Sequence, residues 1–178
     1  MFYTSTRNKN IKVTASQAIA QGISEEGGLF VPCELPQFSL DKIASMVDMP
    51  YTERAKTVLK DFLTDFSEEE LDYCVNGAYA AEKFSSSKIA PTVNVAGNKN
   101  ILELWHGPTC AFKDMALQLL PYLMTVSAKK TADGKTIVIL VATSGDTGKA
   151  ALEGFKDVDN TRILVFYPVD GVSPMQNL

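Results

Sequence analysis

The apolar run Thr136-Ile-Val-Ile-Leu-Val-Ala142 leads directly into the polar loop Thr143-Ser-Gly-Asp-Thr-Gly148. Uninterrupted apolar residues predict a strand that is buried on both faces, as in a parallel sheet. The loop opens a helix that we expect to end near Phe155, and a second strand follows at residues 163–167. A helix is also expected before the run, at residues 112–129. This alternation of helix and strand is typical of α/β domains.

The expected helix at residues 112–129 is apolar on nearly every side, which predicts that it is buried. Its apolar residues are Met115, Ala116, Leu117, Leu119, Leu120, Leu123, Met124 and Val126. Pro121 lies inside the pattern and is expected to kink the helix.

The first 84 residues are expected to form a small, mixed and largely helical unit. Thr14 and Gln17 have the spacing of a capping box, which predicts a helix that ends at Gly22. Short strands are expected at residues 2–4 and 29–31, the second ended by Pro32.

Helical patterns continue from about residue 39 to residue 84. Ser39 and Thr52 are the expected caps of two helices, and Ser67 with Glu70 forms a second capping box. The apolar residues of the last helix fall on one face: Leu71, Cys74, Val75, Ala78 and Tyr79. Its three glutamates, at 68–70, are interpreted as a solvated helix start and not as catalytic acids.

The serines at 85–87 suggest a domain boundary, which divides the chain into residues 1–84 and 85–178. A hairpin is expected around Gly97-Asn98. The predicted fold class is therefore α/β, with a small N-terminal α+β unit followed by part of a three-layer αβα parallel-sheet domain. A helix start at Ser173-Pro174 has almost no residues after it, which suggests a truncated chain.

Composition excludes several classes of function. The formal net charge is −4 and basic blocks are absent, which argues against a nucleic-acid partner. The three cysteines lie far apart and there is a single histidine, so we expect no metal site. The sequence contains neither a signal peptide nor an apolar run long enough to span a membrane. A cytoplasmic protein without a membrane partner is expected, because unpaired cysteines fit a reducing compartment.

Residues 143–148 are a candidate anion-binding loop. Small residues at a helix start let an anionic group approach free backbone amides. The loop lacks the first glycine and the final Ser or Thr of a Walker A motif, and it lacks the dinucleotide pattern G-x-G-x-x-G. Without further context, a polar turn with a good helix cap explains it equally well.

Lys113 lies where the loop from His106 to Ala111 becomes the apolar helix. A lysine in such a place either extends along the surface to water or is held for chemistry. Desolvation favours a neutral amine, and a neutral amine attacks an aldehyde to form a Schiff base. Position alone leaves both interpretations open.

Two segments together resemble the threonine synthase family of fold type II pyridoxal-phosphate enzymes. They are Leu104-Trp-His-Gly-Pro-Thr-Cys-Ala-Phe-Lys-Asp-Met-Ala-Leu-Gln118 and Ala142-Thr-Ser-Gly-Asp-Thr-Gly-Lys-Ala-Ala151. Three further stretches are similar to the family as well. They are Phe2-Tyr-Thr-Ser-Thr-Arg7, Ser24-Glu-Glu-Gly-Gly-Leu-Phe-Val-Pro32 and Gly171-Val-Ser-Pro-Met-Gln176.

The resemblance implies conversion of O-phospho-L-homoserine and water to L-threonine and phosphate. Lys113 would hold pyridoxal 5'-phosphate as an aldimine and act as the catalytic acid–base. Phe112 and Asp146 would lie at the cofactor. The implied substrate-binding residues are Ser144, Gly145, Asp146, Thr147, Gly148, Thr109 and His106. No metal is implied, and the oligomeric state stays open.

The resemblance covers only the first part of the family's enzymes, without their later loop for the cofactor phosphate. We therefore expect the isolated chain to bind the cofactor weakly and to have little or no activity. Two alternatives remain: a related pyridoxal-phosphate lyase such as a dehydratase, and a non-catalytic fragment that binds phosphorylated ligands. Aspartate in the loop and the His-Gly-Pro-Thr segment argue against the dehydratase.

Overall fold

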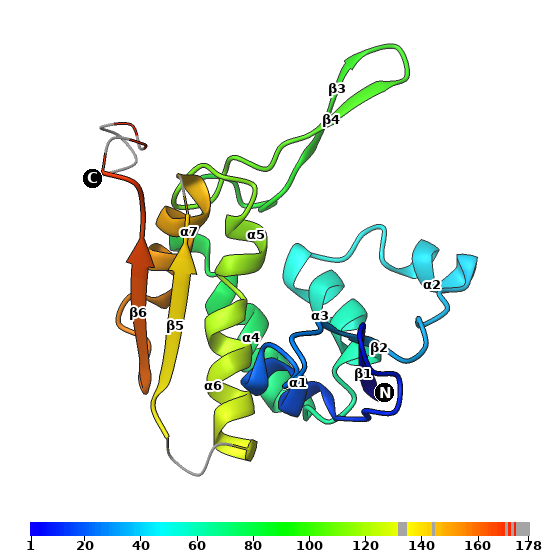
Figure 1. The fold of residues 1–178 in the computed structure, drawn as a ribbon. Helices are drawn as coiled ribbons and strands as arrows, with labels where there is room; N and C mark the ends of the chain where they lie inside the picture. The colour runs from blue at the N-terminus through cyan, green and yellow to red at the C-terminus, as the bar shows by residue number, and fades with distance from the viewer. Residues whose placement is uncertain (132–134, 144, 170, 172, 174–178) are drawn as a thin grey trace. The chain divides into compact units, whose positions relative to one another are not determined.

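The structure is a computed structural model that describes residues 1–131, 135–143, 145–169, 171 and 173. It forms two compact units. Unit 1 comprises Met1–Asn76 and Leu123–Gly134, and unit 2 comprises Gly77–Tyr122 and Lys135–Leu178. Figure 1 shows the elements of both. In the described part of the chain, no helix combines the length and the apolar character needed to cross a membrane.

Unit 1 begins with a two-stranded antiparallel sheet of β1 (Tyr3–Ser5) and β2 (Phe30–Pro32). Helix α1 (Ala15–Gln21) lies between these strands in the sequence. The predicted capping box is confirmed, because the Thr14 hydroxyl accepts from the Gln17 amide and the Gln17 side chain accepts from the Thr14 amide. Gly22 ends the helix with a φ of 74°.

Three further helices begin in unit 1: α2 (Leu40–Ser45), α3 (Tyr51–Phe62) and α4 (Glu68–Ala78). Ser39 caps α2 as predicted. The predicted Thr52 cap is wrong: Pro50, with ψ of 157°, is the N-cap of α3, so Thr52 already lies in the first helical turn. Proline fits this boundary because it has no amide hydrogen that would need a helical partner.

The second capping box and the apolar face of α4 are both confirmed. The Glu70 carboxylate accepts from the Ser67 amide, and the Ser67 hydroxyl accepts from the Glu70 amide. Leu71, Cys74, Val75, Ala78 and Tyr79 are all buried. A short 3-10 helix, η1 (Ala81–Lys83), follows α4.

The predicted hairpin is present in unit 2 as β3 (Thr92–Ala96) paired antiparallel with β4 (Lys99–Leu102). Every residue of the two strands is exposed. Figure 1 shows the hairpin projecting from the rest of unit 2. Asn94 supports the turn, because its side-chain amide donates to the backbone oxygen of Gly97.

The single kinked helix predicted at residues 112–129 is wrong. The structure has two helices instead, α5 (Asp114–Leu117) and α6 (Leu120–Thr131). Pro121 has no amide hydrogen to donate to the Leu117 carbonyl, four residues earlier, so the helix is interrupted before it. Proline then occupies the first turn of α6, where a missing donor is tolerated.

The parallel pairing of β5 (Ile137–Ala142) with β6 (Thr161–Phe166) is confirmed, in register from Ile137 with Thr161 to Ala142 with Phe166. Burial on both faces is not found. Residues alternate along each strand, and Val138, Leu140, Leu164 and Phe166 are more than half exposed. Helix α7 (Asp146–Phe155) connects the strands and packs against both. The apolar residues of β5 and β6 therefore lie on both faces of the sheet, one covered and one exposed.

The mixed α/β fold class is confirmed, with small sheets and helices that are consistent with an incomplete domain. The boundary between residues 84 and 85 stays a prediction. Ser173 lies outside any helix of the described residues, and the remainder of the helix predicted there falls outside them.

Candidate active site around Lys113 and the loop after β5

Lys113 is the residue before the first turn of α5, with helical backbone angles of φ −65° and ψ −20°. Its side chain is partly buried, and Nζ lies 4.4 Å from the centroid of the Phe112 ring. No carboxylate or hydrogen-bond acceptor among the described residues pairs with this amine. The amine is therefore available for chemistry, unlike Lys42, Lys56 and Lys130, which are held in ion pairs.

The loop before Lys113 is fixed by the buried carboxylate of Asp114. Thr109 donates to this carboxylate through both its backbone amide and its hydroxyl. A Cβ atom at Gly107 would lie 2.5 Å from Asp114 Oδ2, so glycine is required there. Thr109, predicted as a substrate-binding residue, thus has its hydroxyl bound within the protein.

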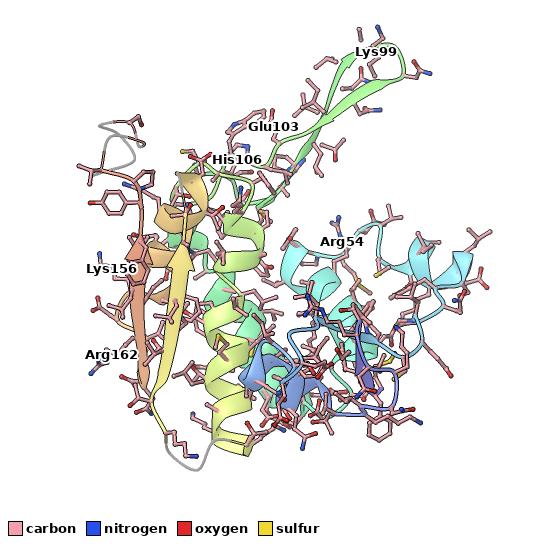
Figure 2. The ribbon with its side chains drawn as sticks, viewed as in Figure 1. Arg54, Lys99, Glu103, His106, Lys156 and Arg162 are labelled. Atoms are coloured by element: carbon pink, nitrogen blue, oxygen red, sulfur yellow. The ribbon has the colours of Figure 1, made fainter. Side chains whose placement is uncertain are left out.

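His106 is held at both ring nitrogens. Nδ1 lies 2.9 Å from the Ser85 hydroxyl, and Nε2 lies 2.7 Å from Glu103 Oε2. Figure 2 labels Glu103 and His106, which lie where the hairpin meets the body of unit 2. The sequence analysis did not identify Ser85 or Glu103. The only sequence signal for this contact was the three-residue spacing of Glu103 and His106. Outside a helix, that spacing alone does not indicate that two side chains meet.

Thr143 organises the predicted anion-binding loop. Its Oγ1 accepts from the backbone amides of Gly145 at 3.2 Å and Gly148 at 3.3 Å. Two of the amides expected to face a ligand are thus already satisfied by the protein. Sequence reasoning placed Thr143 in the motif but assigned it no role.

The other predicted loop residues occupy the start of α7, which begins at Asp146. Asp146 is exposed, Thr147 is intermediate and Gly148 is buried. A Cβ atom at Gly148 would lie 2.3 Å from Thr143 Cγ2, so this glycine lets the helix start lie close to the end of β5. Ser144 lies outside the described residues.

Within unit 2, the lysine and the loop are carried by two helices that pack together. A Cβ atom at Gly154 of α7 would lie 2.2 Å from the backbone oxygen of Leu117 in α5. Figure 1 shows that α5 begins at the end of unit 2 to which β5 points, and the loop follows β5 there. Ligands of open α/β sheets bind outside the carboxyl ends of the strands. Both predicted segments lie at that end.

Metal-binding side chains do not gather at this site. The described residues contain no group of three or more His, Cys, Asp or Glu side chains that could hold a metal ion. Cys110, between the predicted residues, is an exposed free thiol with a positive φ of 58°.

Comparisons with known proteins give a consistent result. The family model described as "Threonine synthase N terminus" matches residues 2–79. Threonine synthase of Pseudomonas aeruginosa is 40% identical over 178 residues, which is 99% of this chain and 37% of that protein. Human threonine synthase-like 1 is 40% identical over 169 residues, which is 90% of this chain and 22% of that protein.

The fold agrees with the sequence comparison. The crystal structure of threonine synthase from Brucella melitensis with bound PLP matches with a TM-score of 0.90 and 38% identity. The match covers 99% of this chain and 37% of that one.

Fold and site together define an α/β module in which a lysine at a helix start accompanies a glycine-containing strand–helix loop. By these similarities, the chain corresponds to the N-terminal part of threonine synthases. It spans less than two fifths of the length of the relatives that it matches.

Proposed function

We propose that this chain carries the lysine half of a pyridoxal-phosphate site, and that Lys113 is the residue to which the cofactor attaches. The reaction is that of threonine synthase, in which O-phospho-L-homoserine and water give L-threonine and phosphate. The support is the similarity to threonine synthases together with the state of Lys113, whose amine has no acceptor among the described residues.

The residues present fit the proposed cofactor. A lysine that attacks an aldehyde must not be held in an ion pair, and the environment of Lys113 satisfies this requirement. The Phe112 ring next to its Nζ is 62% exposed, which leaves an aromatic face for a planar group. When bound, the cofactor supplies an electron sink for carbanion chemistry at the substrate.

Each proposed residue then has a definite task. Lys113 would transfer protons at the α and β carbons of the substrate as a general acid–base. Residues 144–148 bind the substrate carboxylate at the start of α7, where backbone dipoles favour an anion. Phe112 and Asp146 would lie at the cofactor. His106 and Thr109 would lie near the substrate, and their hydrogen bonds keep the lysine loop in place.

Selective labelling tests the assignment of Lys113. The chain is incubated with substoichiometric pyridoxal phosphate, reduced with borohydride and mapped by mass spectrometry. Label should concentrate on Lys113, and Lys113→Arg should remove it. Lys149→Arg is the matched control and should keep it. Label spread evenly over exposed lysines would overturn the assignment.

Turnover tests the reaction. The chain is expected to have little activity, so any residual release of phosphate from O-phospho-L-homoserine should be small, and it should be lost in Lys113→Ala. Deamination of serine or threonine, without release of phosphate from the phosphorylated substrate, would instead show a dehydratase. Binding of phosphorylated ligands that is unchanged in Lys113→Ala, without any turnover, would show the non-catalytic alternative.

The cytoplasm is the proposed location. The three cysteines are free thiols, and two of them, Cys33 and Cys110, are exposed. Exposed free thiols persist in a reducing compartment.

A further inference from the structure

Ser85, His106 and Glu103 form a continuous chain of side-chain hydrogen bonds within unit 2. The Ser85 hydroxyl lies 2.9 Å from His106 Nδ1, and Glu103 Oε2 lies 2.7 Å from Nε2 of the same ring. Glu103 and His106 lie where the β3–β4 hairpin meets the body of unit 2 (Figure 2). The proposed reaction leaves the chemistry of this hydroxyl, imidazole and carboxylate unused.

The Glu103 carboxylate determines which nitrogen of the imidazole carries the hydrogen. A carboxylate only accepts hydrogen bonds, so Nε2 of the neutral ring carries the hydrogen and donates to Glu103 Oε2. Nδ1 then has a lone pair and accepts from the Ser85 hydroxyl. A base that is bonded to a hydroxyl and is itself oriented by a third group is the arrangement that activates a nucleophile.

Backbone hydrogen bonds hold the three residues in this arrangement. The Ser85 amide donates to the His106 carbonyl at 2.9 Å, and the Glu103 amide donates to the Pro91 carbonyl at 2.9 Å. The side chains of His106 and Glu103 are only 17% and 21% exposed. Their hydrogen bond is therefore largely shielded from water, and shielding strengthens such a bond.

A substrate can reach the hydroxyl from solvent, because Ser85 is exposed. The next backbone amide, that of Ser86, donates to no acceptor among the described residues. The amide that follows a nucleophilic serine is one of the donors that stabilise an oxyanion in α/β-hydrolases. The half-exposed Trp105 ring lies beside the imidazole, with 5.7 Å between the ring centroids. This ring offers an apolar surface for a short acyl chain.

We propose that Ser85 is a nucleophile that transfers the acyl group of a small carboxylic ester to water. Its oxygen attacks the ester carbonyl carbon, and its proton passes to His106 Nδ1. The proton then goes to the departing alkoxide as the carbon–oxygen bond breaks, which leaves the acyl group on Ser85. Water repeats the sequence and releases the carboxylic acid. This activity goes beyond the proposed function, since it uses neither Lys113 nor the loop after β5.

Covalent labelling of the unmodified chain tests the nucleophile. A fluorophosphonate probe phosphonylates an activated serine with loss of fluoride, and mass spectrometry locates the label. The label should concentrate on Ser85. If the three residues only stabilise the local structure, Ser85 will react no faster than the other exposed serines, and that result would overturn the proposal. Because the label is read from the unmodified chain, the outcome does not depend on the folding of a variant.

Hydrolysis of p-nitrophenyl acetate tests turnover. Ser85→Ala should lower the initial rate by about 10²-fold, because the activated hydroxyl is lost. Ser87→Ala is the matched control, at an exposed serine whose side chain has no hydrogen bond among the described residues, and it should keep the rate. Thermal melting followed by circular dichroism checks that both variants are folded. An equal rate in Ser85→Ala and the unmodified chain would contradict the assignment of Ser85.

Glu103 is a positioning residue, since it acts through His106. His106 is the only histidine in the sequence, so nuclear magnetic resonance reports its ring nitrogens without ambiguity. In mildly alkaline solution the hydrogen should reside on Nε2. Glu103→Gln should populate both tautomers and slow the labelling of Ser85 by about tenfold or more.

A hydrogen on Nδ1 in the unmodified chain would overturn the proposed mechanism, because that nitrogen could not take the Ser85 proton. Labelling of Ser85 at an unchanged rate in Glu103→Gln would overturn the role of Glu103. None of these measurements involves pyridoxal phosphate, so their outcome is independent of the labelling of Lys113.

Discussion

Thr109 donates two hydrogen bonds to Asp114, from its amide to Oδ2 at 2.8 Å and from its hydroxyl to Oδ1 at 2.6 Å. The Asp114 side chain is completely buried. Hydrogen bonds to an ionised group are stronger than those between neutral groups, and a buried carboxylate needs them. Because Lys113 directly precedes Asp114, this contact fixes the backbone that carries the proposed catalytic amine.

Replacement of Thr109 by valine is expected to destabilise the chain. The variant keeps the side-chain volume but removes the hydroxyl donor to buried Asp114, at a cost of about 1–3 kcal/mol. Urea denaturation measures the change. Thr109→Ser keeps the hydroxyl and should retain most of the stability. Equal losses in the serine and valine variants would show that the methyl group matters and the hydrogen bond does not.

Gly148 and Thr143 should behave as a coupled pair. Gly148→Ala places a Cβ atom 2.3 Å from Thr143 Cγ2, and we expect a loss of about 1–3 kcal/mol from overpacking. Thr143→Ser removes Cγ2 but keeps the oxygen that accepts from two loop amides. The double variant should therefore recover much of the loss, as a double-mutant cycle in urea denaturation would show. Additive losses would contradict this packing account.

Cys74 should be protected from thiol reagents. Burial, with a smaller contribution from the Glu70 carboxylate, raises the pKa of its thiol to about 12. The thiolate is the reactive form, so Cys74 stays inert near neutral pH. A colorimetric thiol assay should count two fast cysteines, Cys33 and Cys110, in the native chain and three in denaturant. Three fast thiols without denaturant would be inconsistent with the packing of α4.

Asp65 should give unit 1 a pH-dependent stability. Burial opposes ionisation of this carboxyl, but hydrogen bonds from Ser16, Thr14 and the Asp65 backbone together outweigh it and hold the pKa below its ordinary value of 3.8. The Ser16 hydroxyl lies 2.6 Å and its amide 3.1 Å from Asp65 Oδ2. A lowered pKa in the folded state contributes stability that is fully present above the ordinary value and is lost as the pH falls through the folded value.

Asp65→Asn should therefore cost most near pH 7, with the difference from wild type shrinking as the pH falls below 3.8. Urea denaturation at several pH values measures this difference. Asp48→Asn, at an exposed position, is the control. A difference between wild type and Asp65→Asn that is constant with pH would mean that the carboxylate charge contributes nothing.

Local sequence signals were sufficient for much of the fold. The capping boxes at Thr14 and Ser67 lie where their spacing predicted them, because the partners are three residues apart and need no distant contact. The hairpin at Gly97 was predicted from a similarly local signal, whereas the parallel pairing of β5 with β6 was predicted from the alternation of strand and helix along the chain. Pro121 was recognised as a disturbance, but whether it kinks or interrupts the helix depends on its neighbours.

In the candidate site, too, contiguous motifs could be recognised from the sequence, whereas contacts between distant residues could not. The sequence by itself determined Lys113 and the loop after β5, since each motif is contiguous and needs no fold to be recognised. Only the tertiary structure decided that Ser85 and Glu103 hold His106, and that Thr109 serves Asp114. The structure also shows that alternate residues of the β5–β6 sheet are exposed, and that Gln118 Nε2 has no hydrogen-bond partner among the described residues. Hydrogen-bond partners and burial depend on which distant residues fill the surrounding space, and no local pattern specifies that.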